Sequence, residues 1–357
     1  MALSPLPRPP DRPAAFRRAL HAWYRVHHRR LPWRAAPSLY GTVLSEFMLQ
    51  QTQVATVLPY YERWRRALPD FAALAAAPEA RVLKLWEGLG YYSRARNLHR
   101  LARALAARPA PPRTPAEWRE LPGVGPYTAA AITSLAFGVP AACVDGNVVR
   151  VLARLTADGT AFRDGAAAVR RFTPAAQALV PRTAPGLHNQ AMMELGALVC
   201  RPRQPRCGDC PVRRFCAAAR DGNPEAYPRL AAKKVEPRET LRVWWEHRGR
   251  LLLHRADDDA RRLAALHELP TPADLGLAEA AVAAAPRLAR HTRSITRHRI
   301  TESIHAVALT AAQRRGVARR PGLRWVPLAE FEHLALSGPH RRWIGGLLRE
   351  RRHPPAG

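Results

Sequence analysis

Two carboxylates are the side chains of this sequence whose types and settings could do chemistry together. Glu46 lies in the stretch Leu44-Ser45-Glu46-Phe47-Met48-Leu49. A carboxyl group in apolar surroundings resists ionisation, so its pKa should rise, as a general acid working near neutral pH requires. Asp145 lies in Val144-Asp145-Gly146-Asn147-Val148. Each also has a plain structural interpretation, Glu46 as a solvent-facing helical residue and Asp145 as the N-cap of a helix over 147–155.

Four cysteines form a second chemical pattern, Cys200-x6-Cys207-x2-Cys210-x5-Cys216. Four thiolates within seventeen residues indicate a metal-binding loop. On spacing alone, tetrahedral zinc and an iron–sulfur cluster both remain open. The fifth thiol, Cys143, is interpreted as a buried apolar residue.

A helical hairpin is expected to position Asp145. Thr114 and Glu117 predict a capping box for a first helix, and a second helix is expected over 126–138. The turn between them, Gly123-Val124-Gly125, is too tight for large side chains. Such a turn can aim backbone N–H groups and a helix N-terminus at a phosphate. A DNA backbone held there would place a sugar near Asp145.

Further helices are expected along the first 200 residues. An amphipathic helix over 14–29 carries Phe16, Leu20, Trp23 and Tyr24 on one stripe. A long, mostly helical segment over 40–54 has Thr42 as its plausible cap. Two or three short helices are expected over 71–110, with Gly88–Tyr92 between them, and helices again over 150–199.

The last third of the chain has a mixed pattern. Strand-like stretches at 241–245, 251–254 and 324–327 alternate with helical ones near 277–285, 328–335 and 340–350. This predicts an α+β domain. A linker is expected over 229–238, and residues 1–13 are interpreted as a disordered, proline-rich tail.

Composition favours a polyanionic partner. The formal net charge is +29, and only three of the 57 basic residues are lysine. Such a field attracts nucleic acid first, although a GC-rich genome also enriches arginine. Neither a signal peptide nor a membrane-spanning window is recognised, so we expect a cytoplasmic protein without membrane contact. Cysteines in that compartment are metal ligands more often than disulfides.

Five stretches, in this order, resemble MutY-type adenine DNA glycosylases of the helix-hairpin-helix, endonuclease III superfamily. They are SEFMLQQTQVATVLPYYERW, GLGYYSRARNLH, LPGVGPYTAAAI, VDGNVVRVLARL and NQAMMELGALVC. The resemblance covers roughly residues 14–228. It implies a mainly α fold, with a two-lobed helix-hairpin-helix glycosylase domain over 14–228 that includes a [4Fe–4S] loop at 200–216. An α+β, Nudix-like lesion-recognition domain is expected over 239–352.

The resemblance also implies an activity. A monofunctional DNA glycosylase of base excision repair would flip adenine, mispaired with 8-oxoguanine or guanine, out of double-stranded DNA. It would then hydrolyse the N-glycosidic bond, acting as a monomer. Glu46 would protonate the adenine, and Asp145 would stabilise the sugar cation or trap it. Tyr127 stands where bifunctional relatives have the lysine that forms a Schiff base, so little strand cleavage is expected.

Other site residues follow from the same resemblance. The four cysteines would hold a [4Fe–4S] cluster, and Trp33 and Glu194 would lie at the base pocket. Contacts to DNA are expected from Leu31, Arg34, Gln50, Gln51, Tyr91, Gly123, Val124 and Gly125. Taken alone, Trp33 would be a buried tryptophan and Arg34 a surface arginine.

The C-terminal domain departs from the family at two positions of its recognition loop. Arg297–Glu302 aligns with the loop that reads 8-oxoguanine, and Thr301 matches its hydroxyl position. Ile300 and Glu302 replace the usual Phe and His, and an acidic residue beside DNA is unfavourable. The carboxylate-rich Nudix helix is missing, and Asp257–Asp259 is interpreted as a turn. This domain is therefore expected to bind and not to hydrolyse.

There are three rival functions. The first and second are glycosylases of the same fold that act on oxidised pyrimidines and on thymine mismatches, respectively. The third is a non-catalytic, cluster-bearing DNA-binding protein. Tyr127 argues against the first. The setting of Glu46 and the extra C-terminal domain argue against the second. The presence of both Glu46 and Asp145 argues against the third, and a base-release assay distinguishes such a binding protein from an enzyme.

Overall fold

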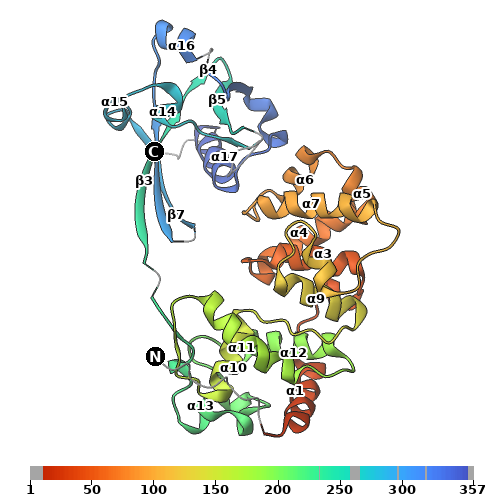
Figure 1. Cartoon of the computed structure of the whole chain (residues 1–357). Coiled ribbons are helices and arrows are strands. Elements are labelled where there is room, and N and C mark those ends of the chain that lie inside the picture. The colour runs from red at the N-terminus through yellow and green to blue at the C-terminus, as the bar shows by residue number, and fades with distance from the viewer. Residues whose placement is uncertain (1–10, 233, 258–265, 296, 318–319, 353–357) are drawn as a thin grey trace. The chain divides into compact units, whose positions relative to one another are not determined.

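The structure is a computed structural model, described over residues 11–232, 234–257, 266–295, 297–317 and 320–352 (Figure 1). The chain forms two compact units. The first comprises Met1–Ala76 and Asn97–Ala232, and the second Ala77–Arg96 and Lys233–Gly357. None of the described helices is both long and apolar enough to span a membrane.

The first unit is mainly helical, as predicted. Its helices are α1 (Pro13–His27), α2 (Pro32–Ala35), α3 (Leu39–Leu49), α4 (Val54–Ala67), α5 (Phe71–Ala76), α7 (Ser93–Ala106, whose first turn belongs to the second unit), α8 (Pro115–Arg119), α9 (Pro126–Phe137), α10 (Gly146–Thr156), α11 (Gly165–Leu179), α12 (Pro185–Leu198) and α13 (Ala217–Arg220). Two short strands, β1 (Ala161–Phe162) and β2 (Arg229–Leu230), pair in parallel.

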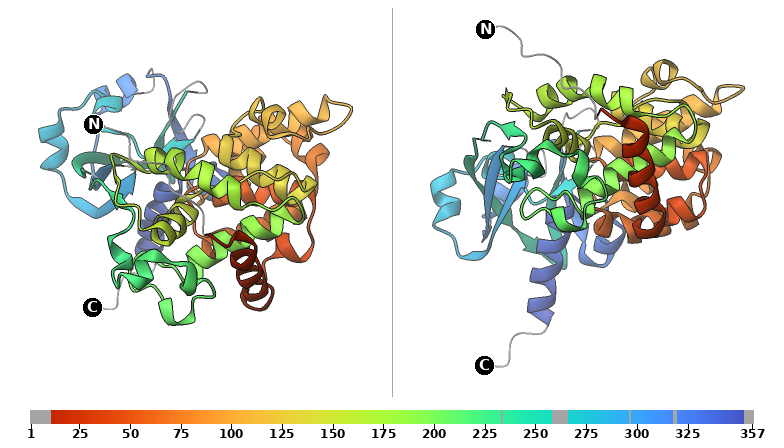
Figure 2. Two further views of the ribbon diagram at one scale, coloured as in Figure 1. Left: turned by 60° about the horizontal axis from the view of Figure 1, so that its bottom comes forward. Right: turned by 90° about the horizontal axis from the view of Figure 1, so that it is seen from below.

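One hydrophobic core of this unit joins segments far apart in the sequence. Phe16 and Leu20 of α1 pack with Leu152 of α10, Phe172 of α11 and Met192 of α12. The views of Figures 1 and 2 show α1, in dark red, beside α12. The predicted helix over 14–29 and its apolar stripe are thereby confirmed. Of the predicted tail, residues 1–10 lie outside the described residues, and Pro13 begins α1.

The expected long helix over 40–54 is two helices, and Thr42 does not cap it. Ser38 is the N-cap of α3, and its Oγ accepts a hydrogen bond from Gly41 N at 3.0 Å. Thr42 is buried inside the helix. The helix ends at Leu49, and Gln51 has a left-handed φ of 56° before α4 begins. A residue in that conformation cannot continue an α-helix.

The hairpin between α8 and α9 is built as predicted. Thr114 and Glu117 form a capping box at the start of α8. Gly123 has a φ of 76°, and a Cβ there would lie 2.5 Å from Cβ of Asn97, so only glycine fits. Gly138 ends α9 in the left-handed conformation.

The second unit contains α6 (Glu79–Trp86) and two sheets. Strands β3 (Glu236–Trp244), β8 (His298–Ala306) and β7 (Arg287–Ile295) form one sheet in the order β3-β8-β7. Strands β4 (Glu246–His247), β5 (Arg250–Arg255), β6 (His267–Glu268) and β9 (Leu323–Pro327) form the other. Its remaining helices are α14 (Pro272–Leu275), α15 (Glu279–Ala283), α16 (Ala311–Val317) and α17 (Gly338–Arg352), and a 3₁₀ helix covers Leu328–His333.

This unit confirms the predicted strands and helices and adds four strands that were missed, the short β4 and β6 and the longer β7 and β8. The expected linker over 229–238 contains β2 at one end and the start of β3 at the other. The segment expected as a recognition loop, 297–302, belongs mostly to β8, because its backbone pairs with β3 and β7 along its length. Asp258 and Asp259 of the acidic run lie outside the described residues.

Glu302 does not face a ligand in this fold. It is fully buried, accepts from Arg242 Nε at 2.8 Å and from Arg293 Nε at 2.6 Å, and lies 3.8 Å from His340 Nε2. Two guanidinium groups thus compensate its charge inside the unit. The expectation that it would repel DNA was wrong for this reason.

Candidate active site

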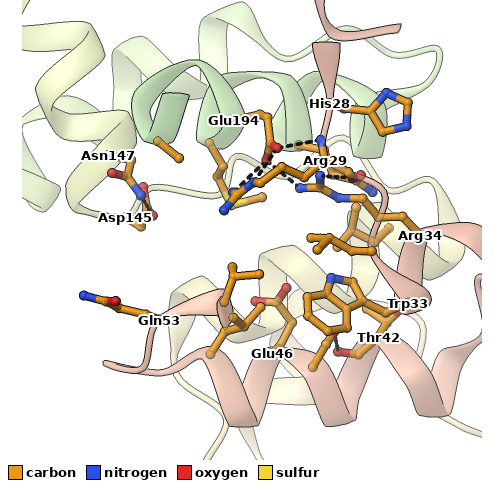
Figure 3. A pocket seen from close by; sticks show the side chains of 18 of the residues that line it. His28, Arg29, Trp33, Arg34, Thr42, Glu46, Gln53, Asp145, Asn147 and Glu194 are labelled. Carbon is orange, nitrogen blue, oxygen red and sulfur yellow. Dashed lines mark hydrogen bonds and ion pairs between the residues drawn. The ribbon is translucent and has the colours of Figure 1, made fainter. Parts of the chain in front are cut away.

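One cavity of about 700 Å³ lies in the first unit, lined by residues of α1 to α4, α9, α10 and α12 and the segments between them (Figure 3). Five side chains singled out in the sequence line it together: Glu46, Asp145, Tyr127, Trp33 and Glu194. They come from five separate segments of the chain, so only the folded unit brings them together.

Glu46 lies near the end of α3, in a run over 40–48 that is entirely buried. Its surroundings are therefore apolar, and burial raises the pKa of Glu46 to about 7. A hydrogen bond with Tyr127 opposes this increase, and negative charge on Asp145 adds to it. The predicted rise is confirmed, and the solvent-facing alternative is wrong. At neutral pH this group can both release and take up a proton.

Tyr127 lies in the first turn of α9, directly after the hairpin. Its hydroxyl is 3.1 Å from Met193 Sδ and also bonds with Glu46. Burial, together with the nearby charge of Glu46, raises the pKa of Tyr127 well above 10. The phenol therefore stays neutral and acts as a hydrogen-bond partner of Glu46.

Asp145 is both a helix cap and a pocket residue. Its Oδ1 accepts from Val148 N at 2.8 Å, which caps α10. Its Oδ2 accepts from Asn147 Nδ2 at 2.9 Å. The interpretation of Asp145 as a helix N-cap is thus correct. It is compatible with a role in the chemistry, because the capped carboxylate still lines the cavity.

Glu194 anchors two arginines at the top of the pocket. It is fully buried and accepts from Arg29 Nε at 2.7 Å and from Arg34 Nη2 at 2.9 Å (Figure 3). Burial opposes ionisation, but the hydrogen bonds from Arg29 and Arg34 outweigh it and hold the pKa of Glu194 at about 2. Arg34 also donates to Arg29 O at 3.2 Å, so its guanidinium is fixed and not a loose surface group.

Part of the cavity wall is apolar and aromatic. Trp33 lines the cavity and meets Tyr61 edge to face, with ring centroids 5.0 Å apart. Leu31, expected at the DNA, is buried and lines the same cavity. A flat aromatic wall beside polar groups is suited to a heteroaromatic base.

The two glutamines expected at DNA lie outside this cavity. Gln50 Nε2 is 3.4 Å from Thr128 Oγ1, and Gln51 is exposed after the end of α3. Tyr91, in the second unit, is 42% exposed with a φ of 45°. Sequence reasoning missed several residues that do line the cavity: Tyr24, Arg29, Thr52, Gln53, Asn147, Gln190 and Met193. Of these, Asn147 could most easily have been found from the sequence, because it follows Asp145 by two residues at the start of a helix.

The hairpin turn leaves room beside Gly125. This residue has an ordinary φ of −88° at the N-cap of α9, and a Cβ there would meet no atom within 4 Å. Nothing in the described protein therefore demands glycine at this position, in contrast to Gly123. Val124 between them is buried. The space beside Gly125 is available to a ligand that approaches the N–H groups of the α9 start.

The four loop cysteines line one small pocket, together with the buried Arg154. All are free thiols, and Arg154 Nη1 lies 3.3 Å from Cys200 Sγ. Burial raises the pKa of the Cys210 thiol to about 12, and charge on Cys200, Cys216 and Cys207 adds to it. Since all four cysteines line the same small pocket, their sulfurs are neighbours.

In the described part of the chain, no three His, Cys, Asp or Glu side chains, the four loop cysteines included, are placed to share one metal ion. A cluster makes a different demand, because each cysteine binds a separate iron. The fifth thiol, Cys143, is buried with Ser134 as its neighbour at 3.7 Å. This confirms its interpretation as a core residue.

Known proteins resemble the chain over the same region. Residues 44–171 match the model of the HhH-GPD superfamily of base excision DNA repair proteins. The adenine DNA glycosylase of Rattus norvegicus is 46% identical over 215 residues, which cover 57% of this chain and 42% of the relative. The adenine DNA glycosylase of Homo sapiens is 46% identical over 215 residues, covering 57% of this chain and 39% of the relative. The chain thus spans about two fifths of the length of these two relatives.

Among solved structures, that of a thermostable thymine-DNA glycosylase matches with a TM-score of 0.52 and 27% identity, covering 59% of this chain and 97% of the other. The family match includes α9, the start of α10 and most of α3, which together supply Glu46, Tyr127 and Asp145. Residues 44–171 thus match the HhH-GPD superfamily of base excision DNA repair proteins, and this matched region contains Glu46, Tyr127 and Asp145.

Proposed function

We propose that the chain is a monofunctional adenine DNA glycosylase, which removes adenine mispaired with 8-oxoguanine or guanine. The observation that carries this proposal is the shared pocket of Glu46 and Asp145, in which burial raises the pKa of Glu46 to about 7. Enzymes that break glycosidic bonds commonly use two carboxyl groups whose environments give them different pKa values. The curated relatives named adenine DNA glycosylase support the choice of base.

The reaction begins when adenine is flipped out of the duplex into the cavity, at a cost of a few kcal/mol that a mismatch reduces. Trp33 offers an aromatic wall for the base. Protonated Glu46 donates its proton to the adenine, so that the bond from C1′ to the base nitrogen breaks and adenine leaves with the bonding electrons. The sugar is left as an oxocarbenium-like cation.

The carboxylate of Asp145 faces that cation. Hydrogen bonds from Val148 and Asn147 hold both of its oxygens in place before substrate arrives, so little reorganisation is needed in the transition state. A water molecule then adds to C1′ and gives its proton to the Glu46 carboxylate. Glu46 returns to its acid form, and the products are free adenine and an abasic site.

Strand cleavage requires a different residue. A Schiff base with the sugar needs an amine, and Tyr127 takes the position after Pro126. The described residues that line the cavity include no lysine. We therefore propose that the abasic strand stays intact until alkali is added. Borohydride should trap no more than a trace of covalent protein–DNA adduct.

Duplex DNA would be held at the hairpin and around the pocket mouth. The open space beside Gly125 and the net charge of +29 support a phosphate contact there. We propose that the protein makes these contacts as a monomer.

The cysteine loop would hold a [4Fe–4S] cluster through Cys200, Cys207, Cys210 and Cys216. The donor set fits, since four neighbouring free thiols line one pocket, whereas the described residues include no three ligands placed to share one ion, as a single zinc ion would require. When bound, the cluster supplies a cross-link that holds the loop and its arginines against DNA. Iron, sulfide and zinc analysis of the purified protein should give about four irons and no zinc; one zinc per chain would overturn this assignment.

The function is tested by single-turnover base release from duplexes that carry adenine opposite 8-oxoguanine or guanine. We expect adenine release from both, strand breaks only after heat and alkali, and no release by Glu46→Gln. A third duplex with thymine opposite guanine tests the rival suggested by the likeness to a thymine-DNA glycosylase. Thymine release without adenine release would overturn the proposal, and so would binding without release from any of the three.

A further inference from the structure

Among the three methionines that the structure describes, Met193 of α12 is the one that meets the active-site cavity. Met48 is fully buried in α3, and Met192 is 3% exposed and belongs to the core of the first unit. Met193 is half-buried and lines the cavity of about 700 Å³, together with Glu46 and Asp145. A small solute that enters the cavity therefore reaches Met193, whereas the protein shields the other two sulfurs.

The sulfur of Met193 accepts a hydrogen bond from a phenol of the same cavity. Tyr127 Oη, in the first turn of α9, donates to Met193 Sδ at 3.1 Å. The same hydroxyl also bonds with Glu46. A thioether is only a weak acceptor, so it competes little with the carboxyl group for the phenol hydrogen. The chemical state of this sulfur therefore bears on the group that donates the proton to adenine.

Oxidation of the sulfur would reverse this competition. When a thioether reacts with a peroxide, a sulfur lone pair attacks one peroxide oxygen. An S–O bond forms, the O–O bond breaks, and the leaving hydroxide takes up a proton to become water. The sulfur is oxidised and the peroxide is reduced. The product is methionine sulfoxide, a polar side chain whose oxygen accepts hydrogen bonds far better than the thioether does.

We propose that Met193 is an oxidation site at which peroxides slow adenine release by forming methionine sulfoxide. This inference rests on the proposed adenine glycosylase activity and adds a modification that regulates it. The sulfoxide oxygen takes the phenol hydrogen of Tyr127 away from Glu46. It also adds a polar atom to the wall of the cavity that receives the base. Because reductases return methionine sulfoxide to methionine, the effect is reversible.

The expected substrate gives this site a chemical context. 8-Oxoguanine is an oxidised guanine, so the oxidants that create the lesion also attack accessible thioethers. Met193 carries the one sulfur among the described residues that line the cavity. The thiol of Cys143 is 2% exposed, and burial raises its pKa far above the usual value, so its reactive thiolate is scarce. Met193 is therefore the sulfur through which such oxidants act on the pocket.

The test exposes the purified full-length protein to hydrogen peroxide, with its iron content measured before and after. Peptide mass mapping locates the added oxygen atoms, and Met193 should be oxidised before Met48 and Met192. Single-turnover adenine release should then fall about 2–10-fold, the scale of exchanging one neutral hydrogen bond. Oxygen on Met48 or Met192 in place of Met193 would overturn the proposal. So would an unchanged release rate once Met193 is fully oxidised.

Matched variants separate Met193 from other targets of peroxide. Met193→Leu removes the sulfur in a volume-conserving exchange, so its release rate should be the same before and after peroxide. Met192→Leu removes the neighbouring buried sulfur, and its rate should fall as in the unaltered protein. Each variant is compared with its own untreated sample, so that a changed basal rate does not affect the result. Equal sensitivity of the two variants would contradict the assignment.

A further measurement needs no substitution. The oxidised, unaltered protein is treated with dithiothreitol and methionine sulfoxide reductases that together accept both sulfoxide epimers. This treatment should restore the release rate. Dithiothreitol alone reduces oxidised thiols but not sulfoxides, so it should not restore the rate. Loss of iron without recovery by the reductases would assign the slowing to the cysteine loop and overturn the proposal.

The pH–rate profile tests the link through Tyr127. The groups that interact electrostatically with Glu46 are Asp145 at the start of α10, Arg34 of α2, Tyr127 of α9 and the thiol of Cys143. The bond from Tyr127 lowers the pKa of Glu46, so its loss on oxidation should move the alkaline limb to higher pH. A limb that stays in place would overturn this link.

The peptide map separates this inference from the proposed function, because it does not depend on activity. If the untreated protein releases no adenine, the proposed function fails, whereas the map still decides whether Met193 is the oxidised residue. If the untreated protein releases adenine and peroxide leaves Met193 unmodified, the proposed function stands and the oxidation site is wrong.

Discussion

Asn147 Nδ2 donates to Asp145 Oδ2 at 2.9 Å, and Asn147 Oδ1 accepts from Arg150 Nη2 at 2.7 Å. Arg150 Nε in turn donates to Cys200 O at 2.7 Å. The amide of Asn147 is thus fixed from both ends, and it cannot turn away without breaking the bond to Arg150. The orientation of the pocket carboxylate therefore depends on a neighbour that contacts the cysteine loop.

The first prediction concerns Asn147→Ala. A hydrogen bond to a charged group is worth about 1.5–3 kcal/mol, so single-turnover adenine release should slow by about 10–100-fold. The melting temperature should change little, because the bond from Val148 N still caps the helix. The exposed Asn223→Ala serves as the control. A rate within twofold of the unaltered protein would show that Asn147 does not position Asp145.

The double role of Asp145 gives a second prediction. Asparagine caps a helix about as well as aspartate, so Asp145→Asn should keep its stability while adenine release falls by at least about 100-fold, the scale of losing one transition-state charge contact. Asp164→Asn makes the same change at the N-cap of α11, away from the pocket. Only the variant at position 145 should lose activity. Equal rates for the two would remove Asp145 from the chemistry.

The raised pKa of Glu46 predicts that the free energy of unfolding falls as the pH rises from 4.5 to about 7. Its pKa is raised from 4.5 to about 7 in the folded protein, so the folded state binds the proton more tightly than the unfolded state. The stability that this supplies is present below pH 4.5 and is lost as pH rises to about 7, at about 1.4 kcal/mol per pH unit. Glu46→Gln lacks this loss. Its free energy of unfolding should gain about 3 kcal/mol relative to the unaltered protein between pH 4.5 and 8, and a constant difference would contradict the burial of a titrating Glu46.

Tyr127 should tune the same group. Its hydrogen bond lowers the pKa of Glu46, so Tyr127→Phe should let that pKa rise. Because the acid form of Glu46 donates the proton, the alkaline limb of the pH–rate profile should move to higher pH. The measurement is single-turnover release from pH 6 to 9. A limb that stays in place, or moves down, would show that the phenol does not contact Glu46 in solution.

In the second unit, Glu302→Gln should be strongly destabilising. Removing one partner of a buried ion pair costs about 3–5 kcal/mol, and here both Arg242 and Arg293 would lose compensation. The control Glu332→Gln removes a carboxylate that is 80% exposed and 3.7 Å from Arg341, and should change stability by less than about 1 kcal/mol. Denaturant unfolding compares the two. Similar small changes would show that Glu302 is accessible to water.

Local signals in the sequence were sufficient for much of the helical unit. The capping box at Thr114, the proline that opens α9 and the cysteine spacing all act within a few residues, so they could be interpreted without a fold. The raised pKa of Glu46 was also predictable, because its apolar neighbours are adjacent in the chain. The motif resemblance then placed these pieces in one superfamily.

Long-range pairing accounts for what was missed. Arg34 appeared as a free contact for DNA because its partner, Glu194, is 160 residues away. Glu302 appeared exposed for the same reason, since Arg242 reaches it only when β3 and β8 pair. Charged residues stand at every third position of strands β7 and β8, Arg287, Arg290 and Arg293 in β7 and Arg299 and Glu302 in β8. This spacing hides the alternation that normally marks a half-buried strand.

The strand β7 lies at an edge of its sheet, paired with β8 alone among the described strands. An unpaired edge invites strand addition from another molecule and hence aggregation. Arg287, Arg290 and Arg293 are spaced along that edge. A second copy would have to bring its own arginines against them, so the edge resists self-association. Replacing these arginines with neutral residues should therefore make concentrated protein aggregate sooner during storage.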